Sequence, residues 1–149
     1  MAQPGNGRVK VTLNQKVLVH LIPFARYADR MDAPEAITQQ GIADLLRVRR
    51  SHVTLALQSL TNHSLVTFET MRIARGTRRK KAYFLTPHGY ERARETEAFL
   101  AAMPVVLDAD GTRISFGRAA EKLGNGHSLR DLLGYLRSDG VLDAPGATG

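Results

Sequence analysis

The amino-acid sequence predicts a mainly α-helical fold with small β-hairpins, of the α+β class. Several segments carry apolar residues at the three- and four-residue spacing of an amphipathic helix. Between residues 66 and 86 apolar and polar residues alternate on both sides of a glycine-containing turn, which is typical of a β-hairpin. Thr86-Pro87 then supplies a helix cap followed by proline at the first helical position. A chain of 149 residues suits one domain, or one domain with a small annex.

The first predicted helix follows a flexible leader. Residues 1–12 are rich in glycine and polar residues and show no periodicity, so we expect them to be loosely ordered. Asn14 is a suitable N-cap for a helix that begins at Gln15. Pro23 lacks an amide hydrogen and is expected to kink or end that helix. The apolar residues of the helix share one face: Val17, Leu18, Leu21, Ile22 and Ala25.

Two further helices are joined by a tight turn, which is the arrangement of a helix-turn-helix. One begins after Thr38, a good N-cap, and runs through QQGIADLL. The other occupies RSHVTLALQSL, residues 50–60. We expect Ala43 where the two helices cross, because only a small side chain fits there. The residues predicted to face the core are Ile42, Leu45, Leu46, Val53, Ala56, Leu57 and Leu60.

A basic hairpin follows directly and makes the predicted motif a winged helix. Its strands are LVTFETMRI and KKAYFLT, joined by ARGTRR. A helix from Pro87 to about Ala102 comes next, and Pro104 is expected to end it. The stretch MRIARGTRRKKAYFLT contains no acid, although like charges repel and contribute nothing to folding. Its six cations are Arg72, Arg75, Arg78, Arg79, Lys80 and Lys81.

The charge of the chain is concentrated in one region. Nine of the 21 Lys and Arg residues, but one of the 14 acidic residues, lie between Arg47 and Ala82. Such clustering is typical of a nucleic-acid-binding surface rather than of a merely solvated face. The longest apolar run, VLVHLIPFA, is too short to cross a bilayer, and no secretory signal is recognisable. A cytoplasmic protein that does not act at a membrane is therefore expected.

These motifs resemble a known family. The segments TQQGIA, RSHV and YFLTPHGYERA, within residues 14–102, are similar to the winged helix-turn-helix DNA-binding proteins common in archaea and, more distantly, to MarR-type regulators. The resemblance implies a DNA-binding regulator, often dimeric. Arg47 stands where the family's turn usually has glycine, and Arg49 replaces the usual Ser or Thr cap. Both departures add a cation where a phosphate would lie.

The helical wheel of residues 49–61 assigns roles in binding double-stranded DNA. Arg50 and Gln58 have forked side chains that suit guanine and adenine edges in the major groove. His52 fits a phosphate contact and a half-buried structural position equally well. The residues predicted to contact bases are Arg50, Ser51, Thr54, Leu55 and Gln58. Those predicted to contact the DNA backbone, or to form the wing on the minor groove or backbone, are Thr38, Gln39, Arg47, Arg49, His52, Arg72, Arg75, Arg78, Arg79, Lys80 and Lys81.

The leading hypothesis is a sequence-specific transcriptional regulator that binds double-stranded DNA as a homodimer. The alternative is a winged-helix adaptor module that binds protein or RNA within a larger complex. The chain contains no cysteine, its five histidines show no ligand spacing, and no catalytic cluster or phosphate-cradling loop is recognisable. We therefore predict no catalytic residue, metal or cofactor, and no enzymatic activity.

The C-terminal part is expected to be a small annex to a winged-helix domain at residues 13–103. Residues 104–143 are predicted to contain a hairpin turning at Asp110-Gly111 and two short helices, GRAAEKL and LRDLLGYLR. Their apolar positions match those of the first motif when the chain is shifted by 76 or 77 residues. This match suggests a degenerate second helix-turn-helix, but short amphipathic helices also match by chance. The tail at 144–149 is expected to fray.

Overall fold

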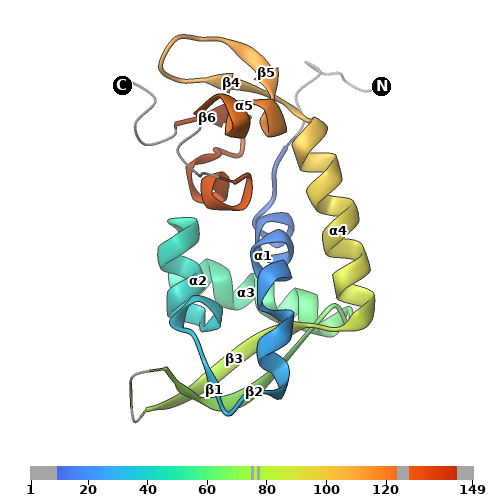
Figure 1. Ribbon diagram of the computed structural model, residues 1–149, viewed down its shortest axis with the longest axis vertical. Helices are drawn as coiled ribbons and strands as arrows, with labels where there is room; N and C mark the ends of the chain where they lie inside the picture. Colours follow the sequence, from blue (N-terminus) through green and yellow to red (C-terminus); the bar gives the residue numbers. More distant parts are fainter. Residues whose placement is uncertain (1–9, 75, 77, 124–127, 144–149) are drawn as a thin grey trace. The chain divides into compact units, whose positions relative to one another are not determined.

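A computed structural model of the chain describes residues 10–74, 76, 78–123 and 128–143. The chain divides into two compact units, Leu13–Thr96 and Glu97–Gly149 with Met1–Thr12, and each is described by itself (Figure 1). The division lies within a long helix, whereas the sequence places the end of the winged-helix domain after residue 103. The extent of each independently folding domain stays a prediction.

The first helix of the larger unit, α1 (Leu13–Leu21), begins slightly earlier than predicted. Beyond Leu21 the chain tightens into a 3₁₀ helix, η1 (Ile22–Asp29), with Pro23 in its first turn. Because proline has no amide hydrogen for the α-helical bond, the predicted end of the helix here is confirmed. His20, in the last turn of α1, is buried, and its Nε2 lies 2.8 Å from the Ala36 carbonyl oxygen.

The helix-turn-helix pair is formed by α2 (Gln39–Leu46) and α3 (Arg50–Asn62). The predicted cap of α2 is confirmed, because Thr38 Oγ1 accepts a hydrogen bond from the Gly41 amide at 3.0 Å. A Cβ atom at Gly41 would overlap the Glu35 carbonyl group. Glycine therefore lets the preceding 3₁₀ turn, η2 (Glu35–Ile37), pack directly against the first turn of α2.

One predicted core position in α2 is wrong. Leu45 is 54% exposed, whereas Ile42, Ala43 and Leu46 are buried. The buried stripe of α2 runs through these three residues, and Leu45 lies about 100° around the helix from Leu46. In α3 the four predicted core residues are buried, so that prediction is confirmed: Val53, Ala56, Leu57 and Leu60.

The predicted hairpin is confirmed as β2 (Val66–Ile73) and β3 (Arg79–Leu85), which pair antiparallel. A short strand that the sequence does not reveal, β1 (Asp32–Ala33), pairs parallel with the end of β2 and completes a sheet of order β1-β2-β3. A strand of two residues is too short to show the alternation by which a sequence reveals a strand. The sheet runs below α1, α2 and α3 in Figure 1.

The helix after the hairpin is α4 (Pro87–Ala102). Its predicted cap is confirmed, because Thr86 Oγ1 accepts a hydrogen bond from the Gly89 amide at 2.9 Å. The helix stops before Pro104, as expected. Within the described residues, no helix is both long and apolar enough to span a membrane.

The smaller unit begins with the predicted hairpin, β4 (Pro104–Leu107) and β5 (Arg113–Ser115). Gly111 adopts a φ of +74° in its turn, a conformation that glycine tolerates without strain. Val11 belongs to this unit, because it is buried and its amide donates to the Ser138 carbonyl oxygen at 3.3 Å. The predicted flexible leader is therefore ordered at its apolar end.

The rest of the smaller unit differs from the predicted pair of helices. An α-helix, α5 (Phe116–Leu123), is followed by a 3₁₀ helix, η3 (Arg130–Tyr135), instead of a second α-helix. Gly134 lies inside η3 and disfavours a regular α-helix there. A final strand, β6 (Val141–Leu142), pairs parallel with β4 and was not predicted. Since residues 124–127 lie outside the described residues, the second helix-turn-helix stays a prediction.

Candidate nucleic-acid interface

The helix α3 presents a polar side away from the core. Four of the five residues predicted to contact bases are exposed, and Thr54 is partly exposed. Leu55 is 63% exposed. Exposure of an apolar side chain to water does not stabilise the isolated chain. His52 is exposed as well, so its interpretation as a half-buried structural histidine is wrong. The predicted base-contact residues therefore share the accessible side of α3, although contact with bases stays a prediction.

The turn between α2 and α3 carries two exposed cations. Arg47 ends α2 in the left-handed conformation, with φ 60° and ψ 45°. Glycine adopts this conformation at less cost, which explains why a family turn would use it. Arg49 is the N-cap residue of α3 and makes no side-chain capping hydrogen bond. Both arginines thus occupy positions that another residue type would stabilise better.

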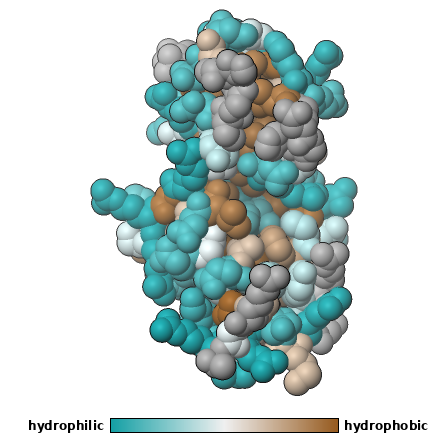
Figure 2. All heavy atoms as spheres, turned by 60° about the vertical axis from the view of Figure 1, so that its left-hand side comes forward, coloured by the Kyte–Doolittle hydropathy of each residue, from teal (hydrophilic) through white to brown (hydrophobic). Residues whose placement is uncertain are grey.

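The register of the hairpin sorts the cations of the wing by face. Residues directly opposite each other in an antiparallel pair point to the same side of the sheet. Four pairs share one side: Arg72 with Arg79, Thr70 with Lys81, Phe68 with Tyr83, and Val66 with Leu85. We call the side that carries Arg72, Arg79 and Lys81 the cationic face of the wing. Hydrophilic residues cover most of the surface around the hairpin (Figure 2).

Lys80 points to the other side of the sheet. It lies opposite Met71, which is buried, and its Nζ forms an ion pair with Glu35 Oε2 at 3.2 Å. Strand alternation turns the Lys80 side chain away from the cationic face, so its predicted contact with the DNA backbone stays a prediction. Arg78 is exposed beyond the strand end, and Arg75 lies outside the described residues.

An aromatic pair supports the cationic face. Phe68 remains 41% exposed, and its ring lies 5.6 Å from the Tyr83 ring at an interplanar angle of 48°. The Lys81 ammonium lies 4.6 Å from the centre of the Phe68 ring, within the range of a cation–π interaction. Phe68 therefore covers Tyr83 and helps to hold Lys81 on the cationic face.

Thr38 is unsuited to its predicted contact with the DNA backbone. Its side chain is committed to capping α2, the residue is 2% exposed, and its hydroxyl lies 2.8 Å from the Glu35 carbonyl oxygen. A hydroxyl that is buried and already hydrogen-bonded does not reach a phosphate. The sequence identified Thr38 correctly as a cap, and this role excludes the second one.

Gln39 connects three elements. Its Nε2 donates to the Tyr83 hydroxyl of β3 at 3.0 Å. Its Oε1 accepts from Arg50 Nε at 3.3 Å and from Thr54 Oγ1 at 3.2 Å, both on α3. Gln39 therefore joins the first turn of α3 to Tyr83, which lies on the same side of the sheet as the cationic face of the wing.

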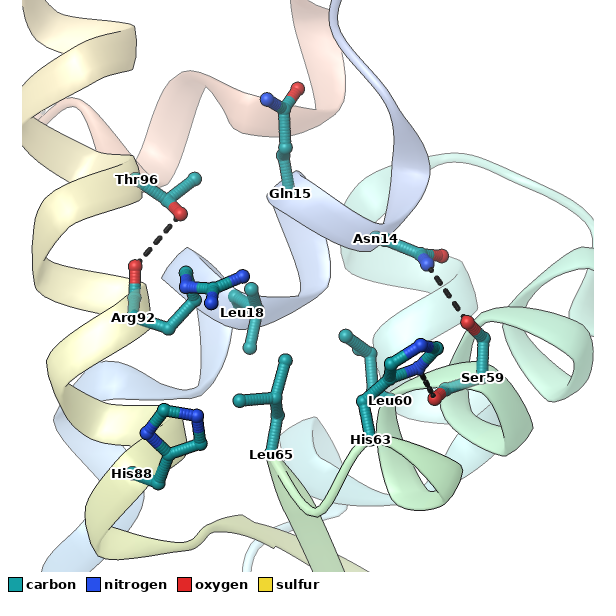
Figure 3. A pocket seen from close by; sticks show the side chains of 10 residues that line it. All are labelled: Asn14, Gln15, Leu18, Ser59, Leu60, His63, Leu65, His88, Arg92 and Thr96. Atoms are coloured by element: carbon teal, nitrogen blue, oxygen red, sulfur yellow. Dashed lines mark hydrogen bonds between the residues drawn. The ribbon is translucent and has the colours of Figure 1, made fainter.

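A separate pocket of about 520 Å³ opens between α1, α3 and α4 (Figure 3). Leu18, Leu60 and Leu65 supply its apolar lining, and His63 and Arg92 contribute basic side chains. No sequence motif predicts this pocket, because its lining residues are spread from Asn14 to Thr96. In the described part of the chain, no three His, Asp or Glu side chains gather into a group that could hold a metal ion.

Sequence reasoning also missed the roles of Tyr83, Phe68 and Glu35 around the interface. Gln39 and Tyr83 are 44 residues apart in the sequence, so only folding brings their side chains together. Tyr83 was expected only as a strand-core residue, which its burial confirms. A tyrosine among buried strand positions is itself a signal, because a buried hydroxyl needs a hydrogen-bond partner.

Comparisons with known proteins give partial structural matches. No protein-family model matches the chain, and no curated protein matches it. The MepR–DNA complex of Staphylococcus aureus matches with a TM-score of 0.44 and 23% identity, covering 60% of this chain and 57% of MepR. A transcriptional regulator homologue from Pyrococcus horikoshii OT3 matches with a TM-score of 0.41 and 16% identity, covering 57% and 72%. ZitR of Lactococcus lactis matches with a TM-score of 0.42 and 22% identity, covering 66% and 57%.

MepR is described as a transcription regulator and the P. horikoshii protein as a transcriptional regulator homologue. The fold described above is a winged helix with mixed helix and strand. These matches do not support the narrower archaeal group suggested by the sequence motifs. The chain spans little more than half the length of MepR and ZitR.

Proposed function

We propose that the Leu13–Thr96 unit binds double-stranded DNA in a sequence-specific manner and that the protein regulates transcription. In this proposal α3 enters the major groove and the cationic face of the wing lies on the minor groove or the adjacent backbone. One observation supports it: the hydrogen bonds of Gln39 to Tyr83 and Arg50 join the wing directly to the start of α3. A duplex that lies across this junction would meet both.

The proposed base contacts come from the exposed side of α3. Arg50 is exposed at the first turn of the helix, and Gln58 is exposed two turns later. Their forked side chains suit guanine and adenine edges, and the exposed Leu55 offers an apolar contact to a thymine methyl group. Ser51 and Thr54, which lie between Arg50 and Gln58 on α3, supply smaller contacts to the bases. Exposure of an apolar residue amid polar ones fits a surface that a partner covers.

The proposed backbone contacts are positive residues at the rim of this surface. Arg47 and Arg49 flank the N-terminus of α3, where the unpaired amides and the helix dipole also favour an anion. The remaining contacts come from the wing and from one exposed histidine: Arg72, Arg78, Arg79, Lys81 and His52. If five cations meet phosphates, the slope of log affinity against log salt concentration should be about −4.5.

We also propose that the protein binds DNA as a homodimer. The helix α4 carries an exposed aromatic residue, Phe99, of the kind that a partner subunit would cover. A two-fold axis would set two α3 helices about 34 Å apart, one turn of DNA, on a site with inverted symmetry. Sedimentation of the protein alone tests this part separately from DNA binding.

Selection of bound duplexes from a random pool tests the proposed function. The protein should enrich one sequence pattern, and single-stranded RNA of the same length should compete poorly. Arg50→Ala should relax the preference at one base position, whereas Arg78→Ala should weaken binding to all duplexes equally. Preferential binding of RNA, or no binding of either nucleic acid at low salt, would favour the adaptor module and reject the regulator.

A further inference from the structure

We infer that Tyr83 and Gln39 form a positioning device that aims the Arg50 guanidinium at the base edges. This inference rests on the proposed function and adds two residues that do not themselves touch a base. It also gives Gln39 a role other than the backbone contact expected from the sequence. The juxtaposition that carries it joins β3, the first residue of α2 and the first turn of α3.

The direction of the Gln39 amide follows from its neighbours. An arginine side chain has only donors, so the Gln39 atom that faces Arg50 Nε at 3.3 Å must be the carbonyl oxygen. The amide nitrogen then points to the Tyr83 hydroxyl, 3.0 Å away, and donates to it. The flipped amide would set donor against donor at Arg50. The chemistry of the site therefore selects one orientation of Gln39.

Tyr83 is a rigid anchor for this orientation. It is 4% exposed, and the Phe68 ring packs beside it. A buried hydroxyl without a partner is costly, so Tyr83 holds the Gln39 amide in place. The Thr54 hydroxyl lies 3.2 Å from the same carbonyl oxygen and 3.0 Å from the Arg50 backbone carbonyl oxygen, so its one proton is shared between two acceptors. The bonds to Tyr83 and Arg50 thus hold the amide from both sides.

The consequence for Arg50 is geometric. Gln39 uses only the Nε–H of Arg50, which leaves both terminal nitrogens of the exposed guanidinium to form a bidentate pair with guanine O6 and N7. A long arginine side chain that is already oriented loses less conformational freedom when it binds. Removing the anchor should therefore reduce discrimination between sequences more than it reduces affinity for DNA in general.

The test compares Tyr83→Phe with Tyr90→Phe. Both changes delete one phenolic oxygen, and the Tyr90 hydroxyl also accepts from an arginine, Arg94, but outside the network. The readout is the ratio of affinities for a duplex selected by the wild-type protein and for a random duplex. Tyr83→Phe should lower this ratio about three- to tenfold and leave the salt slope of random binding unchanged, whereas Tyr90→Phe should change neither.

A double-mutant cycle separates positioning from a purely structural role. If Tyr83 acts through Arg50, Tyr83→Phe should have no further effect on the ratio in an Arg50→Ala protein. An unchanged ratio in Tyr83→Phe, or equal losses for selected and random duplex, overturns the inference while the proposed function stands. A wild-type protein that selects no sequence at all rejects the proposed function itself, and the inference with it.

Discussion

Arg72 of β2 lies directly opposite Arg79 of β3. Both side chains are exposed, and Arg79 Nη2 donates to the Thr70 carbonyl oxygen at 2.9 Å. Two like charges at facing positions of an antiparallel pair destabilise it. The pair is therefore unfavourable for the fold alone, and becomes favourable when an anion lies against the cationic face of the wing.

Reversing one of these charges should raise the stability of the fold and lower its affinity for DNA. Arg72→Glu creates an opposite-charge pair with Arg79, so the free energy of unfolding in urea should rise by about 0.5 kcal/mol. Duplex affinity should fall about tenfold or more, measured by fluorescence anisotropy at low salt. Arg118→Glu, an equal charge change at an exposed site on α5, is the control. An equal loss of affinity in the control would attribute binding to net charge rather than to the cationic face.

A substitution of the left-handed residue between α2 and α3 should also affect stability and DNA affinity differently. Arg47→Gly removes the cost of φ +60° on a residue with a side chain, but it also loosens the unfolded chain. The net effect should be unchanged stability or a gain of up to about 1 kcal/mol. Duplex affinity should fall about three- to tenfold because one proposed phosphate contact is lost. A clear loss of stability would mean that the Arg47 side chain itself holds the turn.

Gly41 should tolerate no side chain. A Cβ atom there would overlap backbone atoms of Glu35, which cannot move without displacing η2 from α2. Gly41→Ala should therefore lower the free energy of unfolding by about 2–3 kcal/mol or more, despite the better helix propensity of alanine. Gln40→Ala, at the exposed neighbouring position, should change it by less than about 0.5 kcal/mol. Urea denaturation of both variants measures the difference, and equal stabilities would contradict the packing described.

His20 should make the larger unit sensitive to acid. Burial lowers the pKa of His20 below the ordinary histidine value of 6.5, and its bond to the Ala36 carbonyl only partly opposes this. The folded state thus favours neutral imidazole, so its contribution to stability is present above about pH 6.5 and is lost as the pH falls through the lowered pKa. His20→Gln keeps a donor for Ala36 without titrating. Its melting temperature should fall less than that of the wild type between pH 7.5 and 5, and parallel curves would contradict this account.

The helix-turn-helix, the hairpin and the caps at Thr38 and Thr86 follow from the sequence, because each depends on local spacing or on neighbouring residues. The parallel strand β1 and the 3₁₀ helix η3 do not, since both are too short to show a period. Exposure of α3 was predicted well, because a single buried stripe fixes its outer side.

The face of each wing cation was harder to predict. Strand alternation shows that Lys80 and Lys81 point in opposite directions, but it does not show which side meets the helices. That depends on the bonds of Gln39 to Tyr83 and Arg50 across the fold. The ion-pair partner of Lys80, Glu35, also lies far away in sequence, so charge clustering alone does not reveal it.

The most direct measurement is the affinity of the wild-type protein for a random duplex as salt is raised from about 50 to 300 mM. We expect tight binding at low salt and a slope of log affinity against log salt concentration of about −4 to −5. Cations of the wing and of the start of α3 would displace counterions from the DNA phosphates. A slope near zero, or no binding at the lowest salt, would contradict the claim that these cations form one DNA-binding surface.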